Sequence, residues 1–196
     1  MLHSRVLLGA SSARTYLYDL DIHGQLFLYA AKPRTLATCF RDARFLDTFY
    51  SRLRRNESDT DAARELRGRG YEWVSMCMGE ENFLCPDEDG SAVVYQGLEG
   101  GSLTYAGSLS TPFDPFSLRL DPSSGYLFHP SPLPRRAKTG LSPYGPYSLL
   151  RSSLVLERFS DGLELDEDKG GSFEYEGRRY PIALLRDGDV WRRQDC

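Results

Sequence analysis

The chain has 196 residues, of which 40% are hydrophobic and 27% charged, and a formal net charge of −4 at pH 7. These values are ordinary for a globular protein and exclude an intrinsically disordered chain. The excess of acid over base argues against nucleic-acid binding as the main role of the whole chain. With 4 Cys and 3 His, a disulfide scaffold or an array of zinc fingers is also excluded.

The N-terminal residues 1–18 include Arg5, Arg14 and several serines but no acidic residue. This composition is typical of a mitochondrial targeting segment, and an ordinary N-terminus is the alternative. The apolar run Val6–Leu8 is too short for a secretory signal, so we expect reduced cysteines rather than disulfides. No apolar run reaches the ~18 residues that a membrane-spanning helix needs.

Residues 1–56 are predicted to form a first unit of hairpin and helix. Residues 15–30 predict the β-hairpin, because aromatic and β-branched residues flank a turn in which Gly24 can adopt a positive φ angle. Helical spacing of apolar residues follows over 36–40 and again over 46–53.

The second of these helices has recognisable ends. Asp42 can cap its start near Ala43, and we expect its apolar face to pack on a sheet of the second unit. Cations favour a helix C-terminus, and three arginines fall in the predicted last turn. These are Arg52, Arg54 and Arg55.

Residues 57–70 are polar and predict a loop or a frayed surface helix, and residues 71–196 predict a β-rich second unit. Proline density makes 130–147 an irregular connection. Residues 148–159 predict a second helix, with a strand as the alternative. The other expected elements are strands at 71–77, 82–85, 92–97, 103–105 and 117–120, a hairpin turn at 87–90, an acidic loop at 161–171 and a hairpin at 173–182 around Glu176-Gly177.

These elements predict an α+β fold, with an antiparallel β-rich core, an N-terminal β-hairpin and one or two amphipathic helices. The sequence contains no nucleophile elbow, no phosphate-binding Gly-rich loop and no other catalytic constellation, so no catalytic residue or cofactor is predicted. Cys77 and Cys85 are too far apart for a zinc pair and are expected to be buried free thiols, so no metal site is predicted.

Two basic clusters are expected to be solvated faces, with contact to RNA phosphates or an acidic partner as the alternative. They comprise Arg52, Arg54, Arg55, Arg135, Arg136 and Lys138. A second hypothesis is a cleft between the two units that binds a nucleotide-like ligand through a few polar side chains, in a binding protein or an enzyme. The candidates are Arg52, Glu80, Asn82, His129 and Arg151.

For two of these candidates a purely structural role is the alternative. His129 can bond the backbone, and Arg151 can form an ion pair with Asp114 or Asp121. Glu80-Glu81-Asn82 is most simply a turn between strands.

Five blocks of sequence carry a resemblance to a known family. They are RTYLYDLDIHGQLFL (14–28), TCFRDARFLDTFYSRLRRN (38–56), GEENFLCPDED (79–89), GYLFHPSP (125–132) and LLRSSLVLE (149–157). In this order they resemble an uncharacterised family of mitochondrial proteins whose human member is named only for its open reading frame on chromosome eight. The resemblance implies a mitochondrial location, in the matrix, and no known reaction.

The resemblance and the lack of a catalytic constellation together predict a non-catalytic mitochondrial protein. We expect an accessory or interaction subunit of a larger assembly, such as the ribosome or a respiratory complex, with protein subunits as partners. The ligand-binding cleft is the alternative. A fainter similarity to a bacterial family of β-rich two-domain proteins, with a proposed nucleotide cleft, is a fold analogy that carries no function by itself.

Overall fold

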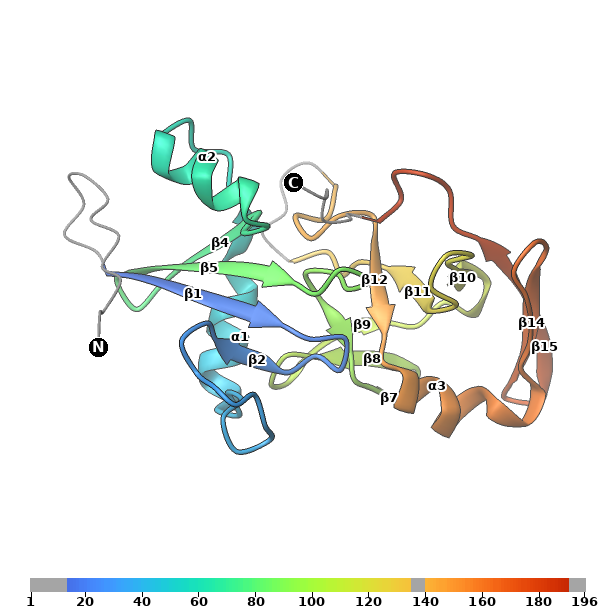
Figure 1. Cartoon of the computed structure of the whole chain (residues 1–196). Helices are drawn as coiled ribbons and strands as arrows, with labels where there is room; N and C mark the ends of the chain where they lie inside the picture. The colour runs from blue at the N-terminus through green and yellow to red at the C-terminus, as the bar shows by residue number, and fades with distance from the viewer. Residues whose placement is uncertain (1–13, 135–139, 191–196) are drawn as a thin grey trace.

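The computed structural model describes residues 14–134 and 140–190. The fold is α+β and rich in strands, as the sequence predicts (Figure 1). The elements are β1 (Thr15–Leu20), β2 (Leu26–Leu28), α1 (Ala43–Ser51), β3 (Leu53–Arg55), α2 (Asp61–Gly68), β4 (Trp73–Cys77), β5 (Glu80–Pro86), β6 (Val94–Tyr95), β7 (Gly97–Glu99), β8 (Ser102–Tyr105), β9 (Leu109–Pro112), β10 (Arg119–Leu120), β11 (Leu127–Pro130), β12 (Tyr147–Leu150), α3 (Ser152–Phe159), β13 (Glu164–Asp166), β14 (Gly170–Tyr175) and β15 (Arg178–Leu184).

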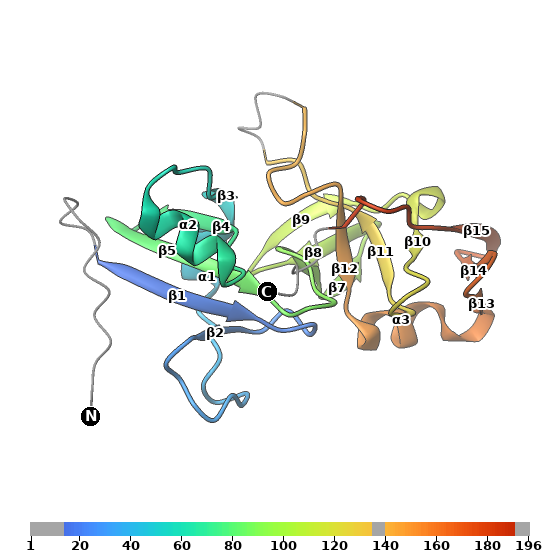
Figure 2. The same cartoon turned by 45° about the horizontal axis from the view of Figure 1, so that its top comes forward.

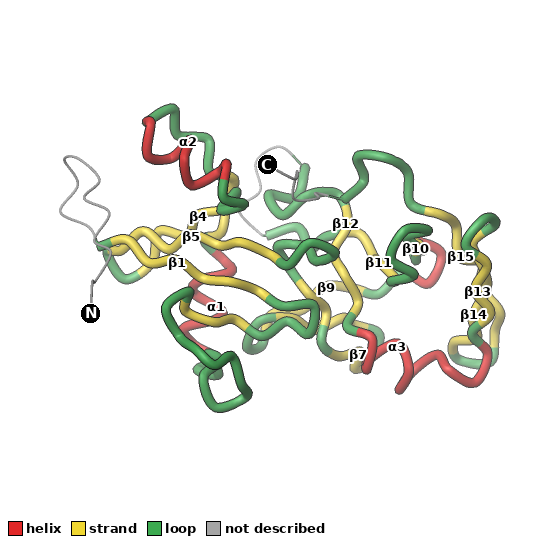
Figure 3. Tube along the Cα trace, in the orientation of Figure 1, coloured by secondary structure: helices red, strands yellow, loops and turns green. Residues whose placement is uncertain are grey.

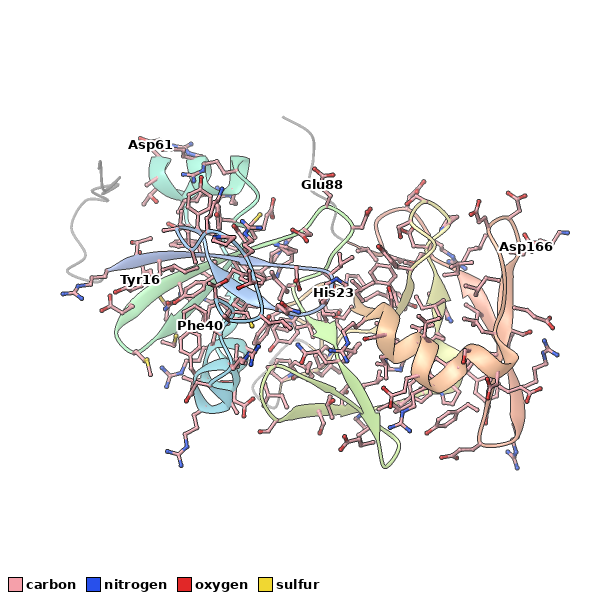
Figure 4. All side chains as sticks on the ribbon, turned by 60° about the horizontal axis from the view of Figure 1, so that its bottom comes forward. Tyr16, His23, Phe40, Asp61, Glu88 and Asp166 are labelled. Carbon is pink, nitrogen blue, oxygen red and sulfur yellow. The ribbon has the colours of Figure 1, made fainter. Side chains whose placement is uncertain are left out.

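Within the described residues the strands form three sheets. The orders are β2-β1-β5-β4-β3, β13-β14-β15-β10-β11-β12-β6 and β7-β8-β9. Most neighbours are antiparallel, and parallel pairing occurs between β1 and β5, β10 and β15, and β12 and β6. The five-stranded sheet lies at one end of the molecule and the β13–β14–β15 ladder at the other (Figures 1 and 2). Asp61 on α2 and Asp166 on β13 mark these two ends (Figure 4).

The N-terminal hairpin is confirmed, since β1 and β2 pair antiparallel. Gly24 in its turn has a φ angle of 78°, and its carbonyl accepts a hydrogen bond of 2.7 Å from the Gln96 side chain. A Cβ atom at Gly24 would lie 2.4 Å from Gln96 Nε2. Glycine is therefore required here both by the backbone conformation and by the close approach of a neighbouring segment.

The helix α1 begins where the sequence predicts, and the Asp42 side chain accepts a hydrogen bond of 2.7 Å from the Phe45 N–H. The helix ends at Ser51, so the prediction that Arg54 and Arg55 lie in its last turn is wrong. Both residues belong to β3, which pairs with β4. Hydrogen bonds to a neighbouring strand outweigh the small gain from cations at a helix end.

The predicted helix over 36–40 is also absent, and Figure 3 shows loop between β2 and α1. The Thr35 N–H donates to Thr38 Oγ1 at 2.9 Å, and the Phe40 N–H donates to the Leu26 carbonyl at 2.8 Å. Side-chain bonds to the backbone compete with helix formation in this way. Phe40 still packs against Tyr18, with ring centroids 5.3 Å apart, although this segment does not form a helix.

Residues 1–56 and 71–196 share one sheet, because β1 pairs with β5 and β3 pairs with β4. The boundary that we expected at 57–70 therefore does not divide the fold. Of the two alternatives for 57–70, the structure has a helix, α2, whose N-terminus is capped by the Thr60 hydroxyl.

Strand pairing beyond 86 also differs in part from the sequence prediction. The turn at 87–90 exists, but β5 and β6 belong to different sheets, so it does not close a hairpin. The stretch 148–159 contains both of its proposed structures, with β12 followed by α3. The acidic loop 161–171 contains β13 at a sheet edge, and the β14–β15 hairpin around 176–177 is confirmed.

The connection between β11 and β12 has no helix or strand over 131–134 and 140–146, as predicted. It is fastened to α1 and to the five-stranded sheet by two buried aromatic side chains. The Tyr144 hydroxyl donates to the Tyr50 carbonyl at 2.8 Å, and Trp73 Nε1 donates to the Pro143 carbonyl at 3.1 Å. None of the helices in the described part of the chain has the length and hydrophobicity of a membrane span.

Candidate interaction surface

The five candidate site residues fall into two groups on different sheets. Arg52, Glu80 and Asn82 lie at the end of the five-stranded sheet where β4 turns into β5. His129 lies on β11 and Arg151 follows β12, both in the seven-stranded sheet. In the part of the chain that the structure describes, no hydrogen bond or ion pair joins one group to the other.

Asn82 is 3% exposed, and its amide serves the hairpin to which it belongs. Its Nδ2 group lies 3.0 Å from the Glu80 carbonyl and 3.2 Å from the Ser75 carbonyl. The Glu80 carboxylate accepts a hydrogen bond of 2.5 Å from the Arg14 N–H. Both side chains therefore stabilise the strand ends, and Asn82 is too buried to contact a ligand from solution. The expected turn at 80–82 is wrong, because β5 already begins at Glu80.

His129 is 4% exposed and uses both ring nitrogens. Nε2 accepts a hydrogen bond of 3.0 Å from the Asp114 N–H, so the ring proton sits on Nδ1 and is donated to the Pro130 carbonyl at 3.1 Å. Burial lowers the pKa of His129, because the charged ring would lose its hydration. The neutral ring packs between Tyr95 and Phe113, in a structural rather than a ligand-binding environment.

The lowered pKa of His129 predicts a fold that weakens on mild acidification. Unfolded His129 takes up a proton as the pH falls through about 6.5, whereas the folded residue resists it, so its stabilising contribution is present above that pH and is lost below it. Urea unfolding at pH 8, 7, 6 and 5 should show this loss, and His129→Gln should flatten the slope between pH 7 and 6. His23→Gln, at an exposed histidine, is the matched control for the His-to-Gln change itself.

Arg151 is the N-cap residue of α3 rather than a residue of its first turn, and its side chain makes no capping bond. The expected ion pair with Asp114 or Asp121 is absent among the described residues. Asp114 instead accepts from the Ser117 hydroxyl and the Phe116 N–H. The Nε atom of Arg151 is buried and has no hydrogen-bond partner within the described chain.

The first basic cluster is only partly available to a partner. Arg55 lies 3.3 Å from the Glu72 carboxylate and 4.6 Å above the Trp73 ring, so it is used internally. Arg52 is exposed, and within the described residues its side chain donates to the Met76 carbonyl alone, at 3.2 Å. Arg54 is exposed and has no ion pair or hydrogen bond to another described side chain. The second cluster, Arg135, Arg136 and Lys138, lies outside the described residues.

Two methionines that the sequence analysis passed over lie on β4, which pairs with β3, and in the turn that follows β4. Met76 is 39% exposed and Met78 is 73% exposed. Met78 and Gly79 form the two-residue turn between β4 and β5, with φ angles of 56° and 77°. Positive φ at both positions is the type I′ arrangement, in which Asn-Gly is favoured. A Met-Gly pair between two strand runs is the sequence signal that could have placed this turn.

Arg52, Arg54, Met76 and Met78 together define the hairpin surface. The two arginines precede or lie within β3, at the edge of the sheet, and the two methionines lie on and beyond the adjacent β4. The surface thus joins exposed apolar side chains to guanidinium groups that have no carboxylate partner in the described chain. Arginine and methionine are both enriched at the cores of protein interfaces.

No solved structure matches the chain. A family model does match, and the matched residues 9–185 contain every strand and helix described above. They also contain the hairpin surface and all five candidate residues. The chain therefore belongs to the family described as a domain of unknown function, DUF4505.

Proposed function

We propose that the protein is a non-catalytic mitochondrial interaction protein, an accessory subunit of a larger assembly such as the ribosome or a respiratory complex. In this proposal the hairpin surface is the site where a protein partner docks. One observation carries the proposal: an exposed methionine, Met78, occupies a left-handed turn position at the tip of the β4–β5 hairpin.

Two local rules of stability are broken at Met78. A left-handed conformation costs a side-chain-bearing residue about 1–2 kcal/mol, and Asn or Gly relieves this cost. A largely exposed thioether side chain also leaves apolar surface in water. Residues that break local rules without a local gain are expected at functional sites. Methionine is suited to such a site because its flexible side chain adapts to different apolar partners.

The mitochondrial location rests on two features of the sequence. The first 18 residues contain arginine and serine without acid, and five blocks of the chain resemble a mitochondrial family. An accessory role in an assembly is consistent with a hairpin that presents apolar and cationic side chains together. The partner's contribution would then be burial of the methionines and pairing of Arg52 and Arg54.

The proposal is tested by Met78→Asn. Because Asn tolerates the left-handed region, we expect the free energy of unfolding to rise by about 1 kcal/mol. The same variant removes the apolar side chain from the tip, so we expect it to lose the partner. Tagged protein would be expressed in cells, and mitochondrial extract would be separated by sedimentation. Wild type should move with a large assembly, and the variant should move as free chain of 22.2 kDa.

The matched control is Glu176→Asn. Glu176 and Gly177 have φ angles of 50° and 73° and form the same kind of two-residue turn between β14 and β15, on another sheet. This control should also stabilise the fold but should leave sedimentation unchanged. Wild-type protein that sediments only as a free monomer, or a Met78→Asn variant that stays in the assembly, would contradict the proposal.

A further inference from the structure

Three sulfur-containing residues follow one another where β4 turns into β5: Met76, Cys77 and Met78. Side chains alternate between the two faces of a strand, so Met76 and Cys77 at the end of β4 point to opposite faces. Cys77 is 1% exposed and belongs to the main hydrophobic core, whereas Met76 is 39% and Met78 is 73% exposed. The two methionines are therefore accessible to a solute, and the cysteine between them is not.

The buried position of Cys77 protects its thiol from oxidants. A cysteine reacts with an oxidant as the thiolate. Burial raises the pKa of the Cys77 thiol, because the thiolate would lose its hydration, and the Asn82 amide donates to the sulfur at 3.3 Å. Cys85 on the next strand is also buried, at 6% exposure. An oxidant in solution therefore meets methionine before cysteine at this hairpin.

Methionine needs no deprotonation to react with a peroxide. The thioether sulfur donates an electron pair to one peroxide oxygen, so that the S–O bond forms as the O–O bond breaks. The displaced hydroxide takes the proton of the transferred oxygen and leaves as water. The sulfur is oxidised to the sulfoxide and the peroxide is reduced, so a polar group replaces an apolar one.

At Met78 this change costs the fold little. The residue lies in the turn after β4, at the end of the five-stranded sheet that is distant from α3 (Figure 1). Because the side chain is 73% exposed, a sulfoxide there places its oxygen in water rather than in the core. The change instead removes the apolar contact that the hairpin surface offers to a partner. Leucine or phenylalanine would offer such a contact as well, but neither becomes polar reversibly.

We propose that Met78 is a modification site, at which a peroxide forms methionine sulfoxide and thereby releases the protein partner from the hairpin surface. This inference rests on the proposed function and adds its regulation. The change is reversible, because methionine sulfoxide reductases restore the thioether. The hairpin surface therefore binds its partner in the reduced form and loses it on oxidation, while the fold stays intact.

The first experiment follows the chemistry in the full chain. Hydrogen peroxide is added to the purified protein, and peptide mass spectrometry measures the gain of oxygen at each sulfur. Met78 should be oxidised at least about tenfold faster than Cys77. Urea unfolding of the oxidised protein should give the wild-type midpoint. Oxidation of Cys77 as fast as Met78, or unfolding of the chain when Met78 is oxidised, overturns the inference.

The second experiment measures the effect of the sulfoxide on binding. Tagged protein that is partly oxidised at Met78 is mixed with mitochondrial extract, and the mixture is separated by sedimentation. The Met78 sulfoxide should be at least about tenfold enriched in the free chain relative to the assembly. Methionine sulfoxide reductase should return the free chain to the assembly. The matched control is Cys39→Ser, which removes a half-buried thiol from the loop between β2 and α1 and should leave the response to peroxide unchanged.

The outcomes separate this inference from the proposed function. Equal proportions of Met78 sulfoxide in the two fractions overturn the inference, as does a Cys39→Ser variant that no longer responds to peroxide. If Met78→Asn still releases the protein from its assembly in that case, the proposed function stands and only its redox control is rejected. Wild-type protein that never enters an assembly, oxidised or not, rejects both.

Discussion

Phe49→Ala is expected to lower the free energy of unfolding by about 3–5 kcal/mol. The Phe49 side chain is 0% exposed, and its ring lies 5.5 Å from the Tyr18 ring and 5.3 Å from the Tyr50 ring. Truncation leaves a cavity between α1 and the five-stranded sheet that these stiff rings cannot fill. Because small folds have only about 5–15 kcal/mol of net stability, the loss should be plain in urea unfolding followed by circular dichroism.

Phe45→Ala provides the control for this prediction. Phe45 belongs to the same helix and the same aromatic cluster, with its ring 5.9 Å from Phe49, but it is only half-buried. Part of its cavity opens to water, so we expect a loss of about 1–2 kcal/mol. A midpoint for Phe49→Ala that equals the wild-type value would show that α1 does not pack on this core.

Trp73→Ala is the second substitution with a large expected effect, also about 3–5 kcal/mol. Trp73 is 0% exposed, and its Nε1 donates to the Pro143 carbonyl at 3.1 Å. The guanidinium of Arg55 lies over its ring. Removal of the indole therefore creates a cavity, leaves a carbonyl without its donor and takes away the aromatic face that Arg55 contacts.

Trp73→Phe separates these contributions. It keeps an aromatic ring in the core but loses the indole N–H, so the loss of the hydrogen bond and of part of the packing should cost about 1–2 kcal/mol. Chemical denaturation of both variants measures how much free energy of unfolding each substitution removes, and the difference between them gives the contribution of the aromatic ring. If Trp73→Ala and Trp73→Phe destabilise the fold equally, the ring itself contributes little, and the packing argument for Trp73 is wrong.

Local chemistry determined those elements that the sequence predicts correctly. The turn glycine Gly24, the capping Asp42 and the Glu176-Gly177 turn act within a few residues of their own position. Their conformations follow from sterics and short hydrogen bonds, which are the same in any fold. The α+β class follows in the same way from the alternation and spacing of apolar residues.

Helical spacing of apolar residues is not sufficient for a helix, as the segment 36–40 shows. Threonine side chains there bond the backbone, and Phe40 donates its N–H to the strand residue Leu26. Arg54 and Arg55 likewise become strand residues because β4 is alongside. In both places a partner from another part of the chain supplies the hydrogen bonds, and no local pattern contains that information.

The roles of the candidate site residues were decided by tertiary structure. His129 and Asn82 are polar residues in strand-like sequence, which is equally compatible with a ligand site and with internal hydrogen bonds. Only the fold shows that Asp114 and Pro130 occupy both nitrogens of His129, and that the carbonyls of the β4–β5 hairpin surround the Asn82 amide. Both side chains are buried, so neither is accessible to a ligand from solution.

By itself the sequence determined the turns and the helix cap that depend on a few neighbouring residues, and the fold class. The pairing of β1 with β5, which joins the two expected units into one sheet, was decided by tertiary structure, because it brings together residues 66 positions apart. The same pairing, with β4 between β5 and β3, creates an outer sheet face on which α2 packs. The hairpin surface exists because the pairing of β3 with β4, and not sequence proximity, brings the Arg52 guanidinium to 3.2 Å from the Met76 carbonyl.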